Sequence, residues 1–160
     1  MFGFKKKQST ISLRAIANGQ LMPITAVADQ VFSQKMMGDG FAIEPTDGTI
    51  TAPADGEIKT VADTKHAVMM TTTDGLELML HLGLDTVELK GAPFEVLVKV
   101  GDHVTAGQPL VTMNLDAVKA AGKGTTVMMV VTNMDQVKTL NVTAPEAVSV
   151  ASTAATVILK

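Results

Sequence analysis

Cysteine is absent from this chain of 160 residues. Without a thiol, the sequence excludes a disulfide framework, iron–sulfur ligation, thiolate zinc sites and a cysteine nucleophile. Tryptophan and tyrosine are also absent, only five phenylalanines are present, and the net charge is −3. Nucleic-acid-binding proteins generally carry a basic surface and stacking aromatic residues, so we expect no nucleic acid among the partners.

Long hydrophobic runs are missing as well. No segment approaches the ~20 apolar residues of a membrane-spanning helix, so we expect no stable membrane insertion. The N-terminus places Phe2 and Phe4 before the lysines 5–7 and lacks the apolar region of a signal peptide. We expect a solvated tail there and a cytoplasmic protein, with a weak peripheral contact to the inner face of the membrane as the alternative.

What is present is a series of short β-type runs separated by turn residues. Hydrophobic residues make up 46% of the chain and charged residues 18%, which is enough for one packed domain. We expect an N-terminal tail and lead-in over residues 1–18 and a single domain over residues 19–160. The repeated Asp-Gly turns predict an all-β fold, an antiparallel β-sandwich or barrel-sandwich hybrid with a few short helical turns. The predicted strands are residues 48–52, 56–61, 67–72, 76–82, 96–98, 110–113, 126–131 and 156–159.

Helical periodicity is weak. Residues 116–121 and 134–140 are predicted to form one or two helical turns each. Residues 29–36 are expected to form a short helix or a loop, with Asp29 as a candidate N-terminal cap.

One predicted strand presents a histidine on its polar face. Between residues 76 and 84 every second residue is leucine, and His81 lies among the residues in between. Since side chains alternate along a strand, the five leucines are predicted to share a buried face and His81 to point the opposite way.

A second histidine, His66, lies on the other side of the turn at Asp74-Gly75. A hairpin loop with an even number of residues would place His66 and His81 on one face, either diagonal or directly opposite. An odd loop would break this pairing. Two neighbouring imidazoles suit phosphoryl transfer or metal binding, and two unrelated histidines remain the alternative.

The run at residues 101–110 (GDHVTAGQPL) resembles the hairpin of biotinyl and lipoyl carrier domains. A swinging-arm carrier of that kind requires a lysine at a hairpin tip, usually in M-K-M or D-K-A, and neither tripeptide occurs. The hairpin therefore supports a related β-sandwich core rather than that chemistry.

Several motifs together resemble the enzyme IIA domain of the glucose subfamily of the bacterial phosphoenolpyruvate-dependent sugar phosphotransferase system. The resemblance runs from about Gly19 to Leu140. The motifs that carry it are residues 29–43 (DQVFSQKMMGDGFAI), 53–56 (PADG), 64–67 (TKHA), 81–91 (HLGLDTVELKG) and 132–133 (TN).

The resemblance implies a function and roles for four residues. Such domains are β-sandwiches that accept a phosphoryl group from the phosphocarrier protein HPr and pass it to the IIB domain of a sugar permease. His81 matches the phosphorylated histidine, modified at Nε2, and His66 the histidine that stabilises the phosphoryl group. Thr64 matches the threonine that orients His66, and we expect the carbonyl of Gly83 to hold Nδ1 of His81.

The docking surface implied by the resemblance combines acidic and apolar residues around the histidines. Asp29 and Asp85 match flanking acidic positions, although a helix cap and a turn residue are the structural alternatives. The candidates for an apolar ring are Val31, Phe32, Met36, Met37, Met79 and Val87. Core filling is the alternative role for the methionines.

A zinc-dependent hydrolase or metal-binding β-sandwich that uses His66 and His81 is the competing prediction. The phosphocarrier needs no cofactor, because its partner supplies an activated phosphoryl group. A zinc ion shared with a partner at a regulatory interface, and further regulatory targets, stay open. The short N-terminus suggests a free-standing protein, and the sequence does not name the sugar.

Overall fold

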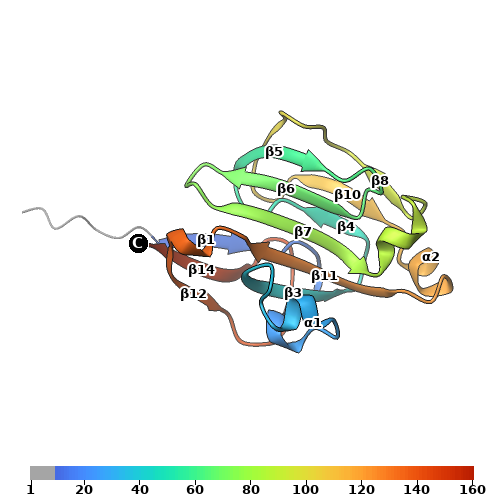
Figure 1. Cartoon of the computed structure of the whole chain (residues 1–160), viewed down its shortest axis with the longest axis horizontal. Coiled ribbons are helices and arrows are strands. Elements are labelled where there is room, and N and C mark those ends of the chain that lie inside the picture. The colour runs from blue at the N-terminus through green and yellow to red at the C-terminus, as the bar shows by residue number, and fades with distance from the viewer. Residues whose placement is uncertain (1–9) are drawn as a thin grey trace, which may run out of the picture.

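The structure, a computed structural model, describes residues 10–160, and its regular structure is mainly antiparallel strands with a few short helical turns (Figure 1). The strands form three sheets. The largest contains, in spatial order, β13 (Ala147–Val148), β2 (Gly19–Pro23), β3 (Asp39–Pro45), β11 (Gly124–Val131), β7 (Glu77–Leu84), β6 (Ala67–Thr72), β5 (Gly56–Val61) and β9 (His103–Val104). The predicted all-β sandwich is therefore confirmed.

Two three-stranded sheets complete the sandwich. One contains β1 (Thr10–Arg14), β14 (Thr153–Leu159) and β12 (Val137–Val142), and the other contains β4 (Thr49–Thr51), β10 (Pro109–Met113) and β8 (Phe94–Val96). The helices are α1 (Gln30–Ser33), α2 (Leu115–Ala120) and the 3-10 turns η1 (Ile24–Ala26), η2 (Thr86–Leu89) and η3 (Met134–Gln136). Among residues 10–160, no helix is long and apolar enough to cross a membrane.

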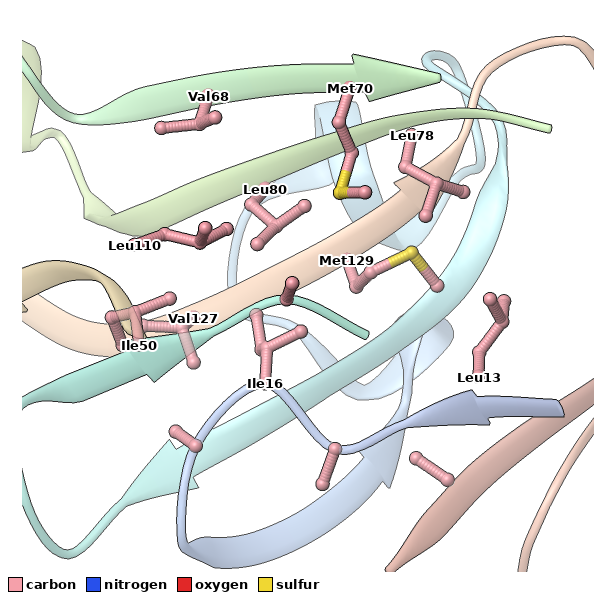
Figure 2. Close-up of a cluster of buried hydrophobic side chains, with 14 of the residues drawn as sticks. Leu13, Ile16, Ile50, Val68, Met70, Leu78, Leu80, Leu110, Val127 and Met129 are labelled. Carbon is pink, nitrogen blue, oxygen red and sulfur yellow. The ribbon is translucent and has the colours of Figure 1, made fainter. Parts of the chain in front are cut away.

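One continuous core fills the space between the sheets. Figure 2 shows side chains from several strands pointing into this interior, among them Leu80, Leu110 and Met129. All three are fully or almost fully buried. Burial of a side chain of this size stabilises the fold by about 1.5–3 kcal/mol, so the strands that contribute them are held firmly.

A second, smaller cluster covers the opposite face of β7, β3 and β11. Its buried residues are Ile24, Val27, Phe32, Ala42, Met79, Met128 and Val130. The helix α1 contributes Phe32 to this cluster, and Figure 1 shows α1 beside β3. The large sheet is thus buried on both faces in this region.

Several strands escaped prediction, and β3 at the centre of the large sheet is the most informative of them. Residues 39–45 form β3, and its Phe41, Ala42 and Ile43 are all fully buried. A strand covered on both faces lacks the alternation of apolar and polar residues that marks a half-exposed strand. The strands β1 and β2 and the two-residue strands β9 and β13 were also not predicted.

The prediction of helical turns over residues 134–140 is wrong for most of this segment. Only Met134–Gln136 forms a 3-10 turn, and Val137–Val142 continues as β12. This strand pairs with β14 from the C-terminal end of the chain. Pairing with a distant strand therefore determines the conformation of this segment, and the local sequence pattern does not indicate a strand.

The predicted lead-in segment is structured where it is described. Thr10–Arg14 form β1, which pairs with β14, and Leu13 and Ile16 are fully buried in the main core. The division of the chain at residue 19 stays a prediction. The expected solvated tail with Phe2, Phe4 and lysines 5–7, and its alternative of a weak membrane contact, lie outside the described residues.

Candidate functional site

Strand β7 has two faces with different neighbours. Leu78, Leu80 and Leu82 are fully buried in the main core, as the alternation predicted. Met79 packs in the second cluster, on the side of His81. Leu84 departs from the prediction, because it contacts the second cluster instead of the other leucines. The preceding Gly83 has a φ of 88°, which interrupts the alternation of the strand.

His81 is held by the backbone of its own strand. Its Nδ1 lies 3.0 Å from the carbonyl oxygen of Gly83. Since a carbonyl oxygen only accepts, Nδ1 carries the proton and donates it, and Nε2 retains a free lone pair. The ring of Phe32 lies against the imidazole, with the two centroids 4.8 Å apart.

Gly83 occupies a position that a side chain would obstruct. A Cβ at this residue would lie 2.8 Å from the carbonyl oxygen of Gly124 and would also collide with the methyl group of Thr86. Its φ is one that L-residues rarely adopt. Glycine is therefore required for the carbonyl to meet the His81 ring.

Burial lowers the pKa of His81 from 6.5 to about 4. The main cause is desolvation, and the neighbouring His66 acts in the same direction. The hydrogen bond to Gly83 and the charges of Asp29 and Asp85 oppose the shift but do not outweigh it. The imidazole is consequently neutral near pH 7, and its Nε2 lone pair is available as a nucleophile.

His66 reaches the site by a different route from the one predicted. The pairs Ala67–His81 and Thr71–Glu77 set the register of the hairpin, and the N–H of Thr72 continues it by donating to the carbonyl of Leu76 at 2.8 Å. The hairpin loop therefore covers residues 73–75, an odd number. The even loop assumed from Asp74-Gly75 is wrong, and regular pairing would place His66 on the other face. His66 instead precedes β6 in a bend, after Lys65 with a φ of 61°, so strand alternation does not fix its direction.

The two imidazoles nevertheless meet. Their ring centroids lie 5.1 Å apart and their planes cross at 81°, edge to face. The pKa of His66 is also lowered, because the ring is partly desolvated. Two neutral rings side by side offer one nucleophilic nitrogen and one N–H donor for the same incoming group.

The side chain of Thr64 contacts the His66 ring, with Oγ1 of Thr64 2.6 Å from Nδ1 of His66. If the hydroxyl donates this hydrogen bond, Nδ1 accepts and the proton of His66 resides on Nε2. A short hydrogen bond two residues away along the chain thus fixes the orientation of the ring. The Nδ1 atom of His66 therefore contacts a side-chain hydroxyl, whereas Nδ1 of His81 contacts a backbone carbonyl.

The two predicted acidic residues adopt the local roles considered as alternatives. Asp29 caps α1, where its Oδ1 accepts the N–H of Val31 at 2.9 Å, which confirms the predicted cap. Asp85 has a left-handed φ of 60° at the start of η2. Both carboxylates also lie close enough to influence the pKa of His81, so structural roles and proximity to the site coincide.

The predicted apolar ring divides into exposed and buried members. Val31, Met36, Met37 and Val87 are exposed, so core filling does not account for the two methionines. Phe32 and Met79 are almost completely buried in the second cluster. They support the site from within, and their assignment as partner contacts stays a prediction.

Met69 is an exposed apolar residue that the sequence reasoning missed. It lies on β6 opposite Met79, on the same face as His81. The alternation of β6 outward from Ala67 could have indicated it, once the register with β7 was known.

The third histidine, His103, lies on β9 opposite Glu57 and apart from the pair. Between residues 10 and 160, no group of three or more histidine, cysteine, aspartate or glutamate side chains could hold a metal ion. A catalytic zinc ion usually takes three protein ligands. The hydrolase alternative therefore has no support.

Comparison with known proteins decides the family. Residues 11–137 match the family model of the phosphoenolpyruvate-dependent sugar phosphotransferase system, EIIA 1. The chain belongs to this family. The resemblance predicted from its motifs is confirmed, and the chain is a phosphocarrier component of a sugar phosphotransferase system.

Individual relatives agree with this assignment. The chain is 42% identical to the glucose-specific EIIA component of Staphylococcus aureus. The alignment covers 86% of this chain and 83% of that protein. It is 46% identical to the glucose-specific EIICBA component of Streptococcus pneumoniae over 84% of its own length, which is only 18% of that protein. The solved structure of the glucose permease IIA from Mycoplasma capricolum superimposes with a TM-score of 0.86, at 35% identity, and covers 98% of this chain and 99% of that chain.

Proposed function

We propose that this enzyme IIA domain accepts a phosphoryl group from the phosphohistidine of HPr on Nε2 of His81 and passes it to the IIB domain of a sugar permease. The observation that carries the assignment is the contact between Nδ1 of His81 and the Gly83 carbonyl. It leaves Nε2 as the one ring nitrogen with a free lone pair. In the transfer, Nε2 forms a bond to phosphorus while the P–N bond of HPr breaks and its electron pair returns to the donor imidazole.

His66 acts in this scheme as a donor of a hydrogen bond to the phosphoryl oxygens. Its ring lies beside that of His81, and Thr64 is placed to keep the proton on Nε2. Phosphoryl transfer places negative charge on the equatorial oxygens, which a fixed N–H donor stabilises. The chemistry needs no cofactor, because the phosphoryl group arrives in an activated form.

The surroundings of the histidines suit docking of a basic protein. Asp29 and Asp85 provide negative charge beside His81, and the basic side chains of HPr would complement them. The exposed Val31, Met36, Met37 and Val87 provide apolar contacts that can adapt to HPr and IIB in turn. A weak, fast encounter of this kind suits a relay.

The relatives suggest a glucose-type sugar. The names of the Staphylococcus and Streptococcus relatives specify glucose, and the latter carries EIIA in one chain with EIIC and EIIB components. The IIB domain is therefore the proposed acceptor, and a cytoplasmic location follows from these partners. Regulatory targets, and a zinc ion held by His66, His81 and a partner's carboxylate, stay predictions.

Intact-mass spectrometry after incubation with phosphoenolpyruvate, enzyme I and HPr tests the proposal. Wild type, His81→Ala, His66→Gln and the control His103→Gln are compared at neutral to alkaline pH, where phosphohistidine survives. We expect one acid-labile phosphoryl group on every protein except His81→Ala. His66→Gln should accept the group but fail to pass it to a IIB domain.

The opposite pattern would refute the assignment. Phosphorylation of folded His81→Ala would place the modification elsewhere, and normal onward transfer by His66→Gln would remove the proposed role of the second ring. The His103→Gln control shows whether replacement of a histidine outside the site affects phosphorylation.

A further inference from the structure

Methionine is the sole sulfur-containing residue of this chain, which has eleven methionines and no cysteine. Their exposure differs sharply. Met36, Met37 and Met69 are 68%, 43% and 36% exposed. The methionines that are 7% exposed or less are Met70, Met79, Met113, Met128 and Met129. Met22 and Met134 are partly buried, and Met1 lies outside the described residues. Accessibility governs how readily a thioether is oxidised, so among residues 10–160 the first three are the most reactive.

All three exposed methionines lie on the side of the molecule that carries His81. Met69 is opposite Met79 on the face of β6 and β7 where Ala67 is opposite His81. Met36 and Met37 follow α1, and the N–H of Met36 donates to the carbonyl of Val31 at 3.1 Å. Phe32 of the same helix contacts the His81 ring. Met69 thus shares the face of the sheet that carries His81, and Met36 and Met37 follow the helix that covers this face.

We propose that Met36, Met37 and Met69 form an oxidation-sensitive modification site that controls access of partner proteins to His81. The inference rests on the proposed phosphotransfer function. The co-reactant is a peroxide such as hydrogen peroxide. The thioether sulfur takes one oxygen atom and loses two electrons, a sulfoxide forms, the O–O bond breaks, and the peroxide is reduced to water.

The sulfoxide changes the surface but leaves the chemistry intact. It turns an apolar, adaptable side chain into a polar one, which weakens an apolar contact with HPr or IIB. The hydrogen bonds at His81 and His66 involve none of these residues. Oxidation should therefore raise the KM for phospho-HPr and leave kcat nearly unchanged. Methionine sulfoxide reductases reverse the modification.

Titration of the 160-residue chain with hydrogen peroxide tests the inference. Peptide mass spectrometry gives the order in which methionines gain oxygen, and the kinetics of transfer from phospho-HPr are measured on the same samples. We expect Met36, Met37 and Met69 to react first and the KM to rise about tenfold, the loss of a substantial interface contact. Treatment with the reductases should restore the original KM.

Two variants separate docking from general damage, and each is compared with its own untreated sample. The triple variant Met36→Leu, Met37→Leu, Met69→Leu should show no peroxide-dependent rise in KM. Met113→Leu, a volume-conserving change in the core, should keep the full sensitivity of wild type. Circular dichroism before and after treatment reports whether the fold survives.

Three results would overturn the inference. These are an unchanged KM once the three methionines are fully oxidised, a triple variant as sensitive as wild type, and earlier oxidation of the buried methionines. If untreated wild type accepts no phosphoryl group, the proposed function fails and the docking effect falls with it. The order of oxidation is still read by mass in that case.

Discussion

His81 and His66 form one site but belong to two differently built regions. His81 lies within β7, with buried leucines on the opposite face and a backbone carbonyl on its Nδ1. His66 lies in a bend before β6, with a threonine hydroxyl on its Nδ1. The residue proposed to carry the phosphoryl group is thus held by rigid main chain, and the residue proposed to assist it is held by a side chain.

This difference has a chemical consequence. A carbonyl can only accept, so it dictates the tautomer of His81 without exception. A hydroxyl can donate or accept, so Thr64 keeps the proton of His66 on Nε2 only by donating its own hydrogen to Nδ1. A nucleophile needs a permanent lone pair, whereas a stabilising residue needs an N–H that can reach the phosphoryl oxygens.

Disruption of the main-chain support at His81 should have the largest effect. Gly83→Ala forces a Cβ against Thr86 and the Gly124 carbonyl in a left-handed conformation. We expect a loss of about 2–5 kcal/mol in the free energy of unfolding from strain and overpacking. Displacement of the carbonyl should also slow phosphoryl acceptance about 100-fold. Urea unfolding measures the loss of stability, and rapid-quench kinetics of phosphoryl transfer from phospho-HPr measure the rate of acceptance.

Gly75→Ala is the matched control for this variant. Gly75 has a similar positive φ of 95°, but no atom lies within 4 Å of the position that its Cβ would occupy. We expect only the backbone cost, about 1 kcal/mol, and normal acceptance. Equal effects of the two variants would show that the close approach at Gly83 is unimportant.

Removal of the side-chain support at His66 should have a smaller effect. Thr64→Val keeps the shape of the residue but deletes the hydroxyl that contacts Nδ1. Since one hydrogen bond contributes about 0.5–1.5 kcal/mol, we expect onward transfer to IIB to slow about three- to tenfold. Acceptance by His81 should change little, and Thr64→Ser should restore the rate. A Thr64→Ser variant as slow as Thr64→Val would show that the hydroxyl is not the cause.

The lowered pKa of His81 predicts a pH dependence of stability with a defined sign. The unfolded histidine takes up a proton near pH 6.5, whereas the folded one does so only at about pH 4. The unfolded state is therefore favoured as the pH falls through this window, and the effect levels off below pH 4. Its size should be about 1–3 kcal/mol, given that the ring is partly exposed.

Urea unfolding between pH 7 and pH 4 measures this contribution as the difference between wild type and His81→Gln. The subtraction removes the titration of carboxylates that both proteins share. His66 contributes in the same direction, because burial lowers its pKa too. An identical pH dependence of the two proteins would contradict the assignment of a buried, neutral His81.

The region of His81 was predictable because its determinants are local. The alternating leucines set its strand and its face, and the main core buries all of them except Leu84. The Gly83 contact spans two residues, so the pattern of the strand contains both partners. Leu84 escaped prediction because the same glycine ends the alternation.

The region of His66 was predictable only in part. Its proximity to His81 was expected from an even hairpin loop, yet the loop over residues 73–75 is odd and the bend at Lys65 brings the ring into place. Loop length and backbone bends depend on contacts with other strands, and a one-residue slip reverses every face. The predicted proximity of His66 and His81 is observed, but the even hairpin loop from which it was derived is not.

Other features depended still more on distant contacts. The strand β3 shows no alternation because both faces are buried, and β12 is a strand because β14 pairs with it. The exposure of Met36, Met37 and Met69 follows from how α1 and β6 surround the site. Composition does not distinguish these methionines from the buried ones.

The fold class, the family and the strand that carries His81 were predictable from the sequence, because these depend on periodicity and on motifs contained in short segments. The approach of the two rings to 5.1 Å, the low pKa of His81 and the exposure of particular methionines became known only from the folded chain. These properties arise from packing between residues far apart in the chain, where desolvation and register are set by every strand at once.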